Sequence, residues 1–399
     1  MKRIYIVGTA DTKAAELVFL KRIVEAAGAS PVVVDVGTLA PLIEADIVAR
    51  DVASAHPQGV DAVLGPRDRG AAVSAMTEAF RRYVLTLDDL DGIVGIGGSG
   101  GTAIVTAGMR ELPIGVPKIM VSTLASGDVS PYVDVSDIVM MPTITDLSGL
   151  NDISRVILTH AGVSVVAMAN APHPTGSGKP AIGLTMFGVT TAAVTQIVER
   201  LGVDYDCLVF HATGTGGRTM EKLAGSGMLR GLIDITTTEI CDFLFGGVLA
   251  STEARLDVVA ETGLPYVGSV GALDMINFWA PETMPAAYRD RLLYRHNANV
   301  TLVRTTADEC RQLGEWIGEK LNRCDGPVRF LIPEKGISAL DIVGGAFFDP
   351  AADAALFHAI EATVIGSDRR RLIRLPYHIN DPAFADAVVS YWHDIAERN

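Results

Sequence analysis

The sequence predicts an α/β fold made of two Rossmann-like domains with mainly parallel sheets and a ligand cleft between them. First, short apolar runs alternate with segments of helical periodicity, which is typical of βαβ units. Second, a stretch rich in proline and glycine at 172–180 divides the chain into two halves, 1–178 and 179–399. Third, turns rich in glycine or hydroxyl side chains follow several strands, and open parallel sheets bind ligands at such strand ends.

Composition narrows the functional class. A chain of 399 residues is longer than one ordinary core and favours two domains. The net charge of −14 argues against nucleic-acid binding, which needs a basic face. No apolar run approaches the roughly 18 residues of a membrane span, and we see no signal peptide. The four cysteines are widely spaced, which predicts reduced thiols in a cytoplasmic protein and no metal site.

The most informative stretch is a predicted strand, 93–96, that runs into a glycine turn and then a helix. The turn is Gly97-Gly98-Ser99-Gly100-Gly101-Thr102, and Gly95, Gly97 and Gly100 have the G-x-G-x-x-G spacing. Glycines let a ligand approach the backbone, and the amides that open a helix face an anion. We predict a phosphate site here. The alternative is a tight turn that binds nothing, although such a turn needs fewer glycines.

The chain begins with a second nucleotide-like feature. A strand at 4–7 and a helix striped by Leu17, Leu20 and Val24 precede another strand at 31–36, which completes a βαβ unit. The turn between the first strand and the helix supplies hydroxyls, a lysine and amides as predicted ligands, namely Gly8, Thr9, Asp11, Thr12 and Lys13. Asp35 ends the second strand, where a ribose-binding acid lies in Rossmann-like folds. A loop cap for Asp35 and a surface position for Lys13 are equally compatible with the sequence.

The rest of the first half adds further strand ends. Residues 38–70 are polar without clear periodicity, which suggests a functional loop or a lid. A helix is expected over 71–83 and strands over 118–121 and 138–141, and Ser122 and Thr123 join the predicted site. The Gly176–Lys179 segment resembles a P-loop, but residue 180 is proline, so we interpret 172–180 as a linker.

The second half repeats this plan. A strand at 182–187 leads to Gly188 and a helix at 192–201. A strand at 207–210 then leads to a second glycine turn, whose predicted ligand-binding residues are Thr213, Gly214, Gly216 and Gly217. Thr236 to Thr238, after a strand at 232–235, match Ser122 and Thr123. The order of these matches predicts two related domains, with the second glycine turn equivalent to the first.

Two residues beside the second glycine turn are catalytic candidates. His211 could act as a general base, and Arg218 could hold a phosphate or carboxylate. A hydrogen-bonded histidine at a strand end is the favoured alternative for His211. The cluster Arg289, Arg291, Arg295 and His296 fits either a solvated helix face or an anion site.

Several of these motifs together resemble one known family of bacterial and plant proteins. They are Ile6–Lys13, Gly97–Thr102, Ala212–Gly217, Ile332–Gly336 and Ile379–Asp381. The family includes the ATP-binding N-terminal domain of the tomato mosaic virus resistance protein. The resemblance covers nearly the whole chain and implies two Rossmann-like domains, ATP binding and a homodimer. It supplies no catalytic residue.

The leading hypothesis is therefore a cytoplasmic, metabolic ATP-binding protein that acts on or senses a small anionic metabolite, with ATP bound with or without Mg²⁺. If it is an enzyme, we expect an ATP-dependent or hydrolase-like activity on a small acid. One alternative is an enzyme for a phosphorylated or carboxylated molecule that ATP regulates. Another is a protein-interaction module that nucleotide stabilises.

Overall fold

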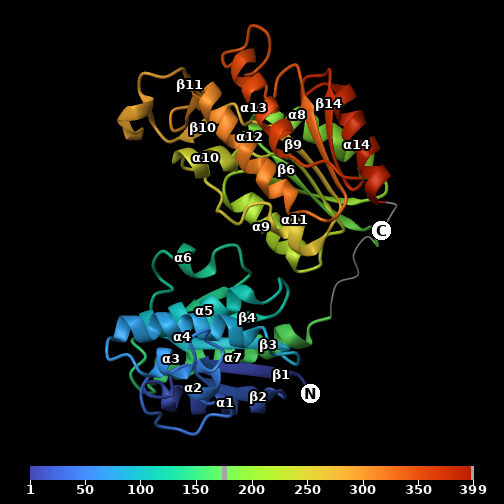
Figure 1. Ribbon diagram of the computed structural model, residues 1–399. Coiled ribbons are helices and arrows are strands. Elements are labelled where there is room, and N and C mark those ends of the chain that lie inside the picture. Colours follow the sequence, from blue (N-terminus) through green and yellow to red (C-terminus); the bar gives the residue numbers. More distant parts are fainter. Residues whose placement is uncertain (173–177, 397–399) are drawn as a thin grey trace. The chain divides into compact units, whose positions relative to one another are not determined.

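The computed structural model describes residues 1–172 and 178–396 and divides into two compact units, Met1–Pro174 and Thr175–Asn399 (Figure 1). The predicted boundary at 178 lies a few residues beyond this division. Most of the predicted linker, including the P-loop-like Gly176 and Ser177, lies outside the described residues. Each unit is an α/β sandwich around a parallel sheet, which confirms the predicted fold class; the cleft between the units stays a prediction.

The first unit contains one parallel sheet with strand order β2-β1-β3-β4-β5. Its elements are β1 (Arg3–Gly8), α1 (Ala14–Ala26), β2 (Ser30–Asp35), α2 (Ala49–Ala53), α3 (Val60–Leu64), α4 (Arg69–Val84), β3 (Gly92–Gly97), α5 (Ser99–Glu111), β4 (Lys118–Ser122), α6 (Ser130–Val133), β5 (Val139–Pro142) and α7 (Asp152–Asn170). The segment 38–70, expected to be irregular, thus contains two short helices and the start of a third.

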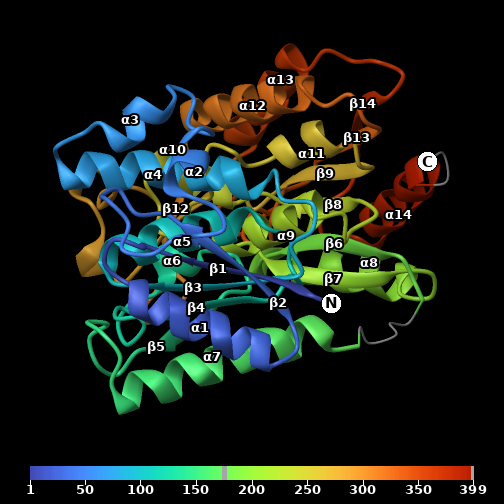
Figure 2. The ribbon, with the colours of Figure 1, turned by 90° about the horizontal axis from the view of Figure 1, so that it is seen from below.

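Helices cover both faces of this sheet, as Figure 2 shows for α1 and α7 on one face and α4 and α5 on the other. The stripe of Leu17, Leu20 and Val24 on α1 packs with Leu158 and Val165 of α7 against alternate residues of the strands. The inner strands β3 and β4 are buried from both sides, so they are nearly continuous apolar runs.

Helix α7 is long and apolar enough to cross a membrane by length and composition, the only described helix that is. Its Leu158, Ala161 and Val165 are fully buried against the first sheet. One face of the helix therefore packs on the sheet, while Ile153, Val156 and Val163 on the helix remain about half exposed.

The second unit contains a parallel sheet of order β14-β13-β9-β8-β6-β7 and a small antiparallel sheet of order β10-β12-β11. Its elements are β6 (Ala181–Met186), η1 (Gly188–Thr190), α8 (Thr191–Leu201), β7 (Asp206–His211), α9 (Thr215–Gly225), β8 (Leu232–Thr236), α10 (Glu239–Phe245), α11 (Asp257–Thr262), β9 (Tyr266–Gly271), β10 (Met275–Phe278), η2 (Pro281–Thr283), η3 (Ala286–Tyr288), β11 (Leu293–Arg295), β12 (Thr301–Arg304), α12 (Ala307–Asn322), β13 (Val328–Pro333), α13 (Pro350–Thr363), β14 (Arg370–Leu375) and α14 (Pro382–Ala396).

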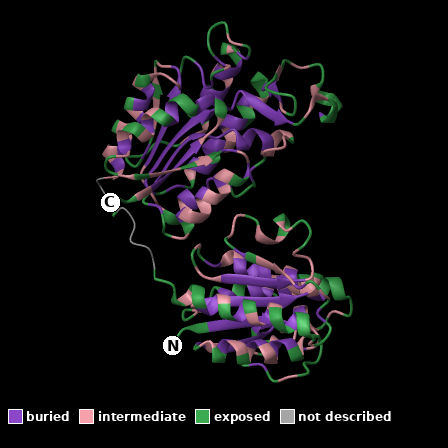
Figure 3. Cartoon of the chain, turned by 180° about the vertical axis from the view of Figure 1, so that it is seen from behind, coloured by how far each residue is buried: buried purple, intermediate pink, exposed green. Residues whose placement is uncertain are grey.

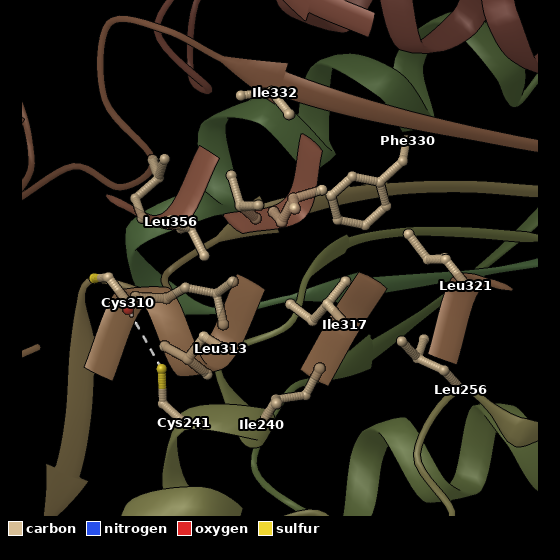
Figure 4. Packing of buried hydrophobic residues seen from close by; sticks show 14 of the residues in the cluster. Ile240, Cys241, Leu256, Cys310, Leu313, Ile317, Leu321, Phe330, Ile332 and Leu356 are labelled. Carbon is tan, nitrogen blue, oxygen red and sulfur yellow. Dashed lines mark hydrogen bonds between the residues drawn. The ribbon is translucent and has the colours of Figure 1, made fainter. Parts of the chain in front are cut away.

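The inner strands β8, β9 and β13 of this larger sheet are buried on both faces, as the burial colours of Figure 3 show. Helices α8 and α14 cover one face. On the other face, Leu313, Ile317 and Leu321 of α12 lie in the same cluster as Phe330 of β13 (Figure 4). All four cysteines are free thiols, as the sequence predicts.

The strand order corrects part of the predicted internal repeat. The first sheet, read from β2, has the strand order 2-1-3-4. The second sheet, read from β7 and numbered from β6 as its first strand, has the same order, so β6 corresponds to β1 and β8 to β3. The second glycine turn follows β7, which is an edge strand and corresponds to β2. The two glycine turns are therefore not equivalent. Their local sequences are similar, whereas strand pairing decides which turn lies at the centre of a sheet.

The secondary structure of the residues around Arg289 also differs from the predicted helix. They form the short η3 helix and strand β11 rather than the face of a helix. Arg291 pairs with Glu309, with 2.7 Å between Nη2 and Oε2.

Candidate functional site

A cavity of about 430 Å³ lies at the carboxyl ends of β1 and β3. These adjacent strands have their connections on opposite faces of the sheet, and ligands of open parallel sheets bind at such a switch point. The described residues that line the cavity are Thr9, Asp11, Thr12, Lys13, Val36, Thr38, Leu39, Pro66, Arg67, Arg69, Ala72, Val73, Gly98, Ser99, Gly100, Gly101 and Ile104. Much of the predicted first-half site is therefore brought to one place.

The turn after β1 is held by its own backbone. The Thr9 carbonyl accepts hydrogen bonds from the amides of Thr12 and Lys13, at 3.1 and 2.8 Å. The hydroxyls of Thr9 and Thr12 lie 2.6 Å apart at the cavity. This geometry presents two hydroxyls and the Lys13 side chain on one side of the site.

The glycine turn after β3 forms the opposite side of the cavity and leads into α5. No described side chain caps this helix, so the amides of its first turn have no intrahelical or side-chain acceptor in the described structure. A Cβ added at Gly100 or Gly101 would lie 3.5 Å from its nearest protein neighbour, and one at Gly98 would lie 3.8 Å away. None of the three has a positive φ. The fold itself therefore does not require glycine at these positions, although all three face the cavity.

Gly97 and Gly8 have a different role. A Cβ on Gly97 would lie 2.8 Å from the backbone of Gly101, and one on Gly8 would lie 2.9 Å from Ile96. These two glycines let β1, β3 and α5 pack closely, and they do not line the cavity.

Three cationic side chains surround the same cavity, namely Lys13, Arg67 and Arg69. Within the described part of the chain, none of them forms an ion pair. Asp11 is the only acidic residue among the described residues of the lining. In a chain of net charge −14, this local excess of positive charge favours an anionic ligand.

Asp11 is the one described lining carboxylate that could contact a metal ion. Its Oδ2 accepts the amide of Leu39 at 3.1 Å, while Oδ1 is buried without a partner in the described structure. No group of three or more metal-ligating side chains occurs among the described residues. A Mg²⁺ ion here would therefore be held mainly by a ligand's phosphates.

Four further predicted residues lie behind the cavity rather than in it, namely Asp35, Thr102, Ser122 and Thr123. Asp35 is buried, and its Oδ1 accepts the amides of Ala10 and Gly37 at 2.8 and 2.7 Å. It therefore fastens the loops after β1 and β2 and does not line the cavity, which corrects the ribose assignment. Burial raises the pKa of this carboxyl.

The hydroxyls of Thr102 and Ser122 are also buried, 2.7 Å from each other, and they join α5 to β4. Thr123 is tied to the turn through its amide, which donates to the Gly97 carbonyl at 3.3 Å. Through these contacts, the three residues fix the position of the glycine turn without lining the cavity.

The second glycine turn is occupied by the protein itself. Oε1 of Glu239 accepts the amides of Gly214 and Gly217, at 2.7 and 3.1 Å. A Cβ on Gly216 would overlap the His211 carbonyl, and one on Gly217 would overlap the Glu239 carboxylate. Gly214 has φ +83°. The prediction that these amides bind a cofactor is therefore wrong for Gly214 and Gly217, because an internal carboxylate takes that place.

Glu239 belongs to a buried ionic network centred on Arg255. The Arg255 guanidinium contacts Glu221, Asp234 and Glu239 at 2.7, 2.8 and 3.2 Å. Burial alone would lower the pKa of Arg255, but these acids outweigh it and raise the pKa. The second turn thus has a structural function.

The catalytic candidates are not assembled into one constellation. Thr213 and His211 line a separate cavity of the second unit, where the His211 ring lies 5.4 Å from that of Phe187. Arg218 donates from Nε to the Gly214 carbonyl at 3.1 Å and is not among the described residues of that lining.

Sequence reasoning missed Arg67, Arg69, Thr38 and Val73 as site residues. The polar segment 38–70 suggests a lid, and its two arginines are the available signal. Their approach to the glycine turn depends on α4 packing beside α5, which no local pattern encodes.

Two domain models of one family match the chain, UPF0261 N-terminal at residues 2–174 and UPF0261 C-terminal at 179–396. The chain belongs to the uncharacterised protein family UPF0261. A UPF0261 protein of Rhizobium meliloti is 67% identical over 99% of this chain and 100% of its own length. One of Clostridium tetani is 42% identical over 100% of both chains.

The UPF0261 region also occurs in a plant protein. The ToMV resistance protein Tm-1 of Solanum lycopersicum is 40% identical to the whole of this chain, which spans 56% of the tomato protein. Among solved structures, a UDP-N-acetylglucosamine 2-epimerase matches with a TM-score of 0.20 and 11% identity over 92% of each chain. This distant likeness carries no argument about function.

Proposed function

We propose that the first unit binds ATP, with the phosphates over the Gly98–Gly101 turn. The observation that carries the proposal is the set of glycines that line the cavity without being required by the fold. Glycine at such positions allows phosphate oxygens to reach the backbone amides.

The charges and the shape of the cavity support a nucleoside triphosphate. Lys13, Arg67 and Arg69 supply three positive charges beside the amides of α5. Apolar side chains on the remaining wall, Val36, Leu39 and Pro66, suit the base. The volume of about 430 Å³ is within the usual range for small-molecule sites.

Binding is tested by calorimetry and thermal unfolding with ATP, ADP and AMP, with and without Mg²⁺. A ligand that binds only the folded state stabilises it by about 2.7 kcal/mol at a hundredfold excess over Kd. If the cations hold the phosphates, affinity falls in the order ATP, ADP, AMP. No shift with any nucleotide at millimolar concentration contradicts the proposal.

The site is located with Gly100→Val. The added side chain has room at Cβ but extends toward the ligand, so ATP affinity should fall by at least about a hundredfold, near 2.7 kcal/mol, while the unit still folds. Gly127→Val is the matched control, since Gly127 is exposed, has an ordinary φ and lies outside the cavity. Equal affinities for ATP in the two variants would place the phosphates elsewhere.

The cytoplasmic location expected from the cysteines and the homodimer implied by the resemblance remain part of this proposal. Four free cysteines suit a reducing compartment. Light scattering of the purified protein, with and without ATP, measures the oligomeric state.

A further inference from the structure

The second unit contains a cavity of about 550 Å³ that the proposed nucleotide site does not use. It lies at the carboxyl ends of β6 and β7, and the small antiparallel sheet contributes its other wall. The described residues that line it are Phe187, Gly188, Val189, His211, Thr213, Val248, Leu249, Trp279, His296, Asn297, Val300 and Leu302.

The walls come from two different parts of the fold. Phe187 directly follows β6, and His211 ends β7, so their rings meet with centroids 5.4 Å apart. Trp279 follows β10 on the other side. The loop between β11 and β12 carries His296, whose amide donates to the Val300 carbonyl at 3.1 Å. Each wall therefore presents one large aromatic ring and one imidazole.

The lining combines apolar area with hydrogen-bond donors. Trp279 lines the cavity and remains 49% exposed, so a ligand in the cavity would bury part of its apolar surface. Imidazole, hydroxyl and amide donors come from His211, Thr213, His296 and Asn297. None of the described lining residues is acidic, although acids outnumber bases in the chain by 47 to 33. This composition fits a ligand with an apolar ring and an anionic head.

We propose that this cavity binds a small aromatic acid, with its ring between Phe187 and Trp279 and its anionic group beside the imidazoles of His211 and His296. The anion contacts side chains here, because Glu239 already occupies the amides of the neighbouring glycine turn. The proposal does not depend on nucleotide binding in the first unit.

The full chain is tested with two fluorescent probes that share one aromatic body. These are 8-anilinonaphthalene-1-sulfonate, which is anionic, and the neutral N-phenyl-1-naphthylamine. Both should bind, the sulfonate more tightly. Gly188→Leu is the blocking variant, since Gly188 lines the cavity, has an ordinary φ and leaves open space for 4 Å around the position that a Cβ would take. It should weaken both probes by at least about tenfold.

The control is Gly366→Leu, at an exposed glycine of the same unit with similarly open space and outside this cavity. It should leave both affinities unchanged. Far-UV circular dichroism and thermal unfolding of each variant separate loss of the site from loss of the fold. Equal binding by wild type and Gly188→Leu, or no binding of either probe to the wild type, overturns the proposal.

The head group is tested with the double variant His211→Gln and His296→Gln. Because both imidazoles face the anion, sulfonate affinity should fall at least about fivefold while the neutral probe changes less than about twofold. Equal losses for the two probes would overturn the assignment of the head group. If probe binding in the wild type disappears as protein concentration rises, a second copy covers the cavity and the small-molecule proposal is wrong.

Discussion

The two glycine turns differ in what satisfies their amides. The turn after β3 faces a cavity, and among the described residues it has no capping side chain and is surrounded by cations that form no ion pair. The turn after β7 is filled by the carboxylate of Glu239, which Arg255 holds in place. Similar sequences therefore differ in what contacts their amides. Glu239 begins α10 after β8, a strand that β6 separates from β7. At the first turn, Ser122 ends the neighbouring strand β4 and Thr123 follows it, and neither side chain accepts an amide of the turn.

The largest expected difference in stability appears when one methyl group is added to each turn. In Gly216→Ala, the new Cβ overlaps a backbone carbonyl that cannot move aside, so we expect a loss of more than about 3 kcal/mol of stability. Gly101→Ala has ordinary space and should change stability by less than about 1 kcal/mol. Urea unfolding followed by circular dichroism measures both. Similar losses in the two variants would remove the distinction between a filled and an open turn.

Removing the Glu239 carboxylate should lower the stability somewhat less than Gly216→Ala does. Glu239→Ala leaves two buried amides without an acceptor and weakens the pairing of Arg255, for a loss of about 3 kcal/mol. Acetate or formate can enter the vacated position, so either anion should raise the melting temperature of this variant more than that of the wild type. Equal shifts would show that Glu239 does not take the place of an anion.

A third expectation concerns pH in the second unit. Burial raises the pKa of Asp274 to about 7, and the nearby charge of Asp341 adds to the rise. Because the folded state holds this proton more tightly than the unfolded chain, the stabilisation is present at low pH and is lost as pH rises through about 7.

Asp274→Asn mimics the protonated form and keeps an acceptor for Ser338. Relative to the wild type, it should therefore gain about 2–3 kcal/mol between pH 5 and pH 8. Unfolding curves across this range give the difference, and a constant difference would show that Asp274 does not titrate there. The comparison is sharpened because the difference between the variant and the wild type isolates the contribution of Asp274, which lies in the second unit.

The smallest effect is expected at Asp35. Asp35→Asn keeps Oδ1 as the acceptor for Ala10 and Gly37, so stability should change by less than about 1 kcal/mol and ATP affinity by less than about threefold. Calorimetry with ATP measures the affinity. A large loss of ATP affinity in a variant that unfolds normally would restore Asp35 as a ribose ligand.

Local patterns in the sequence are sufficient for several features. The stripe on α1 and the buried strand before Gly97 predict the βαβ units, and the hydroxyls and lysine after β1 predict one side of the first cavity. The partner of the second glycine turn cannot be predicted in this way, because Glu239 lies 22 residues beyond Gly217 and reaches it only through strand pairing. For the same reason the sequence places Asp35 correctly at a strand end but does not reveal its hydrogen bonds to the loop after β1.

Glu239 can also be viewed as a ligand attached to its own receptor. A tethered group competes at a fixed effective concentration, so the second turn stays saturated whatever the surrounding solution contains. The first turn has no such tethered competitor among the described residues. If it binds ATP as proposed, its occupancy follows the free ATP concentration, so the fraction of bound protein changes with that concentration, whereas the occupancy of the second turn does not.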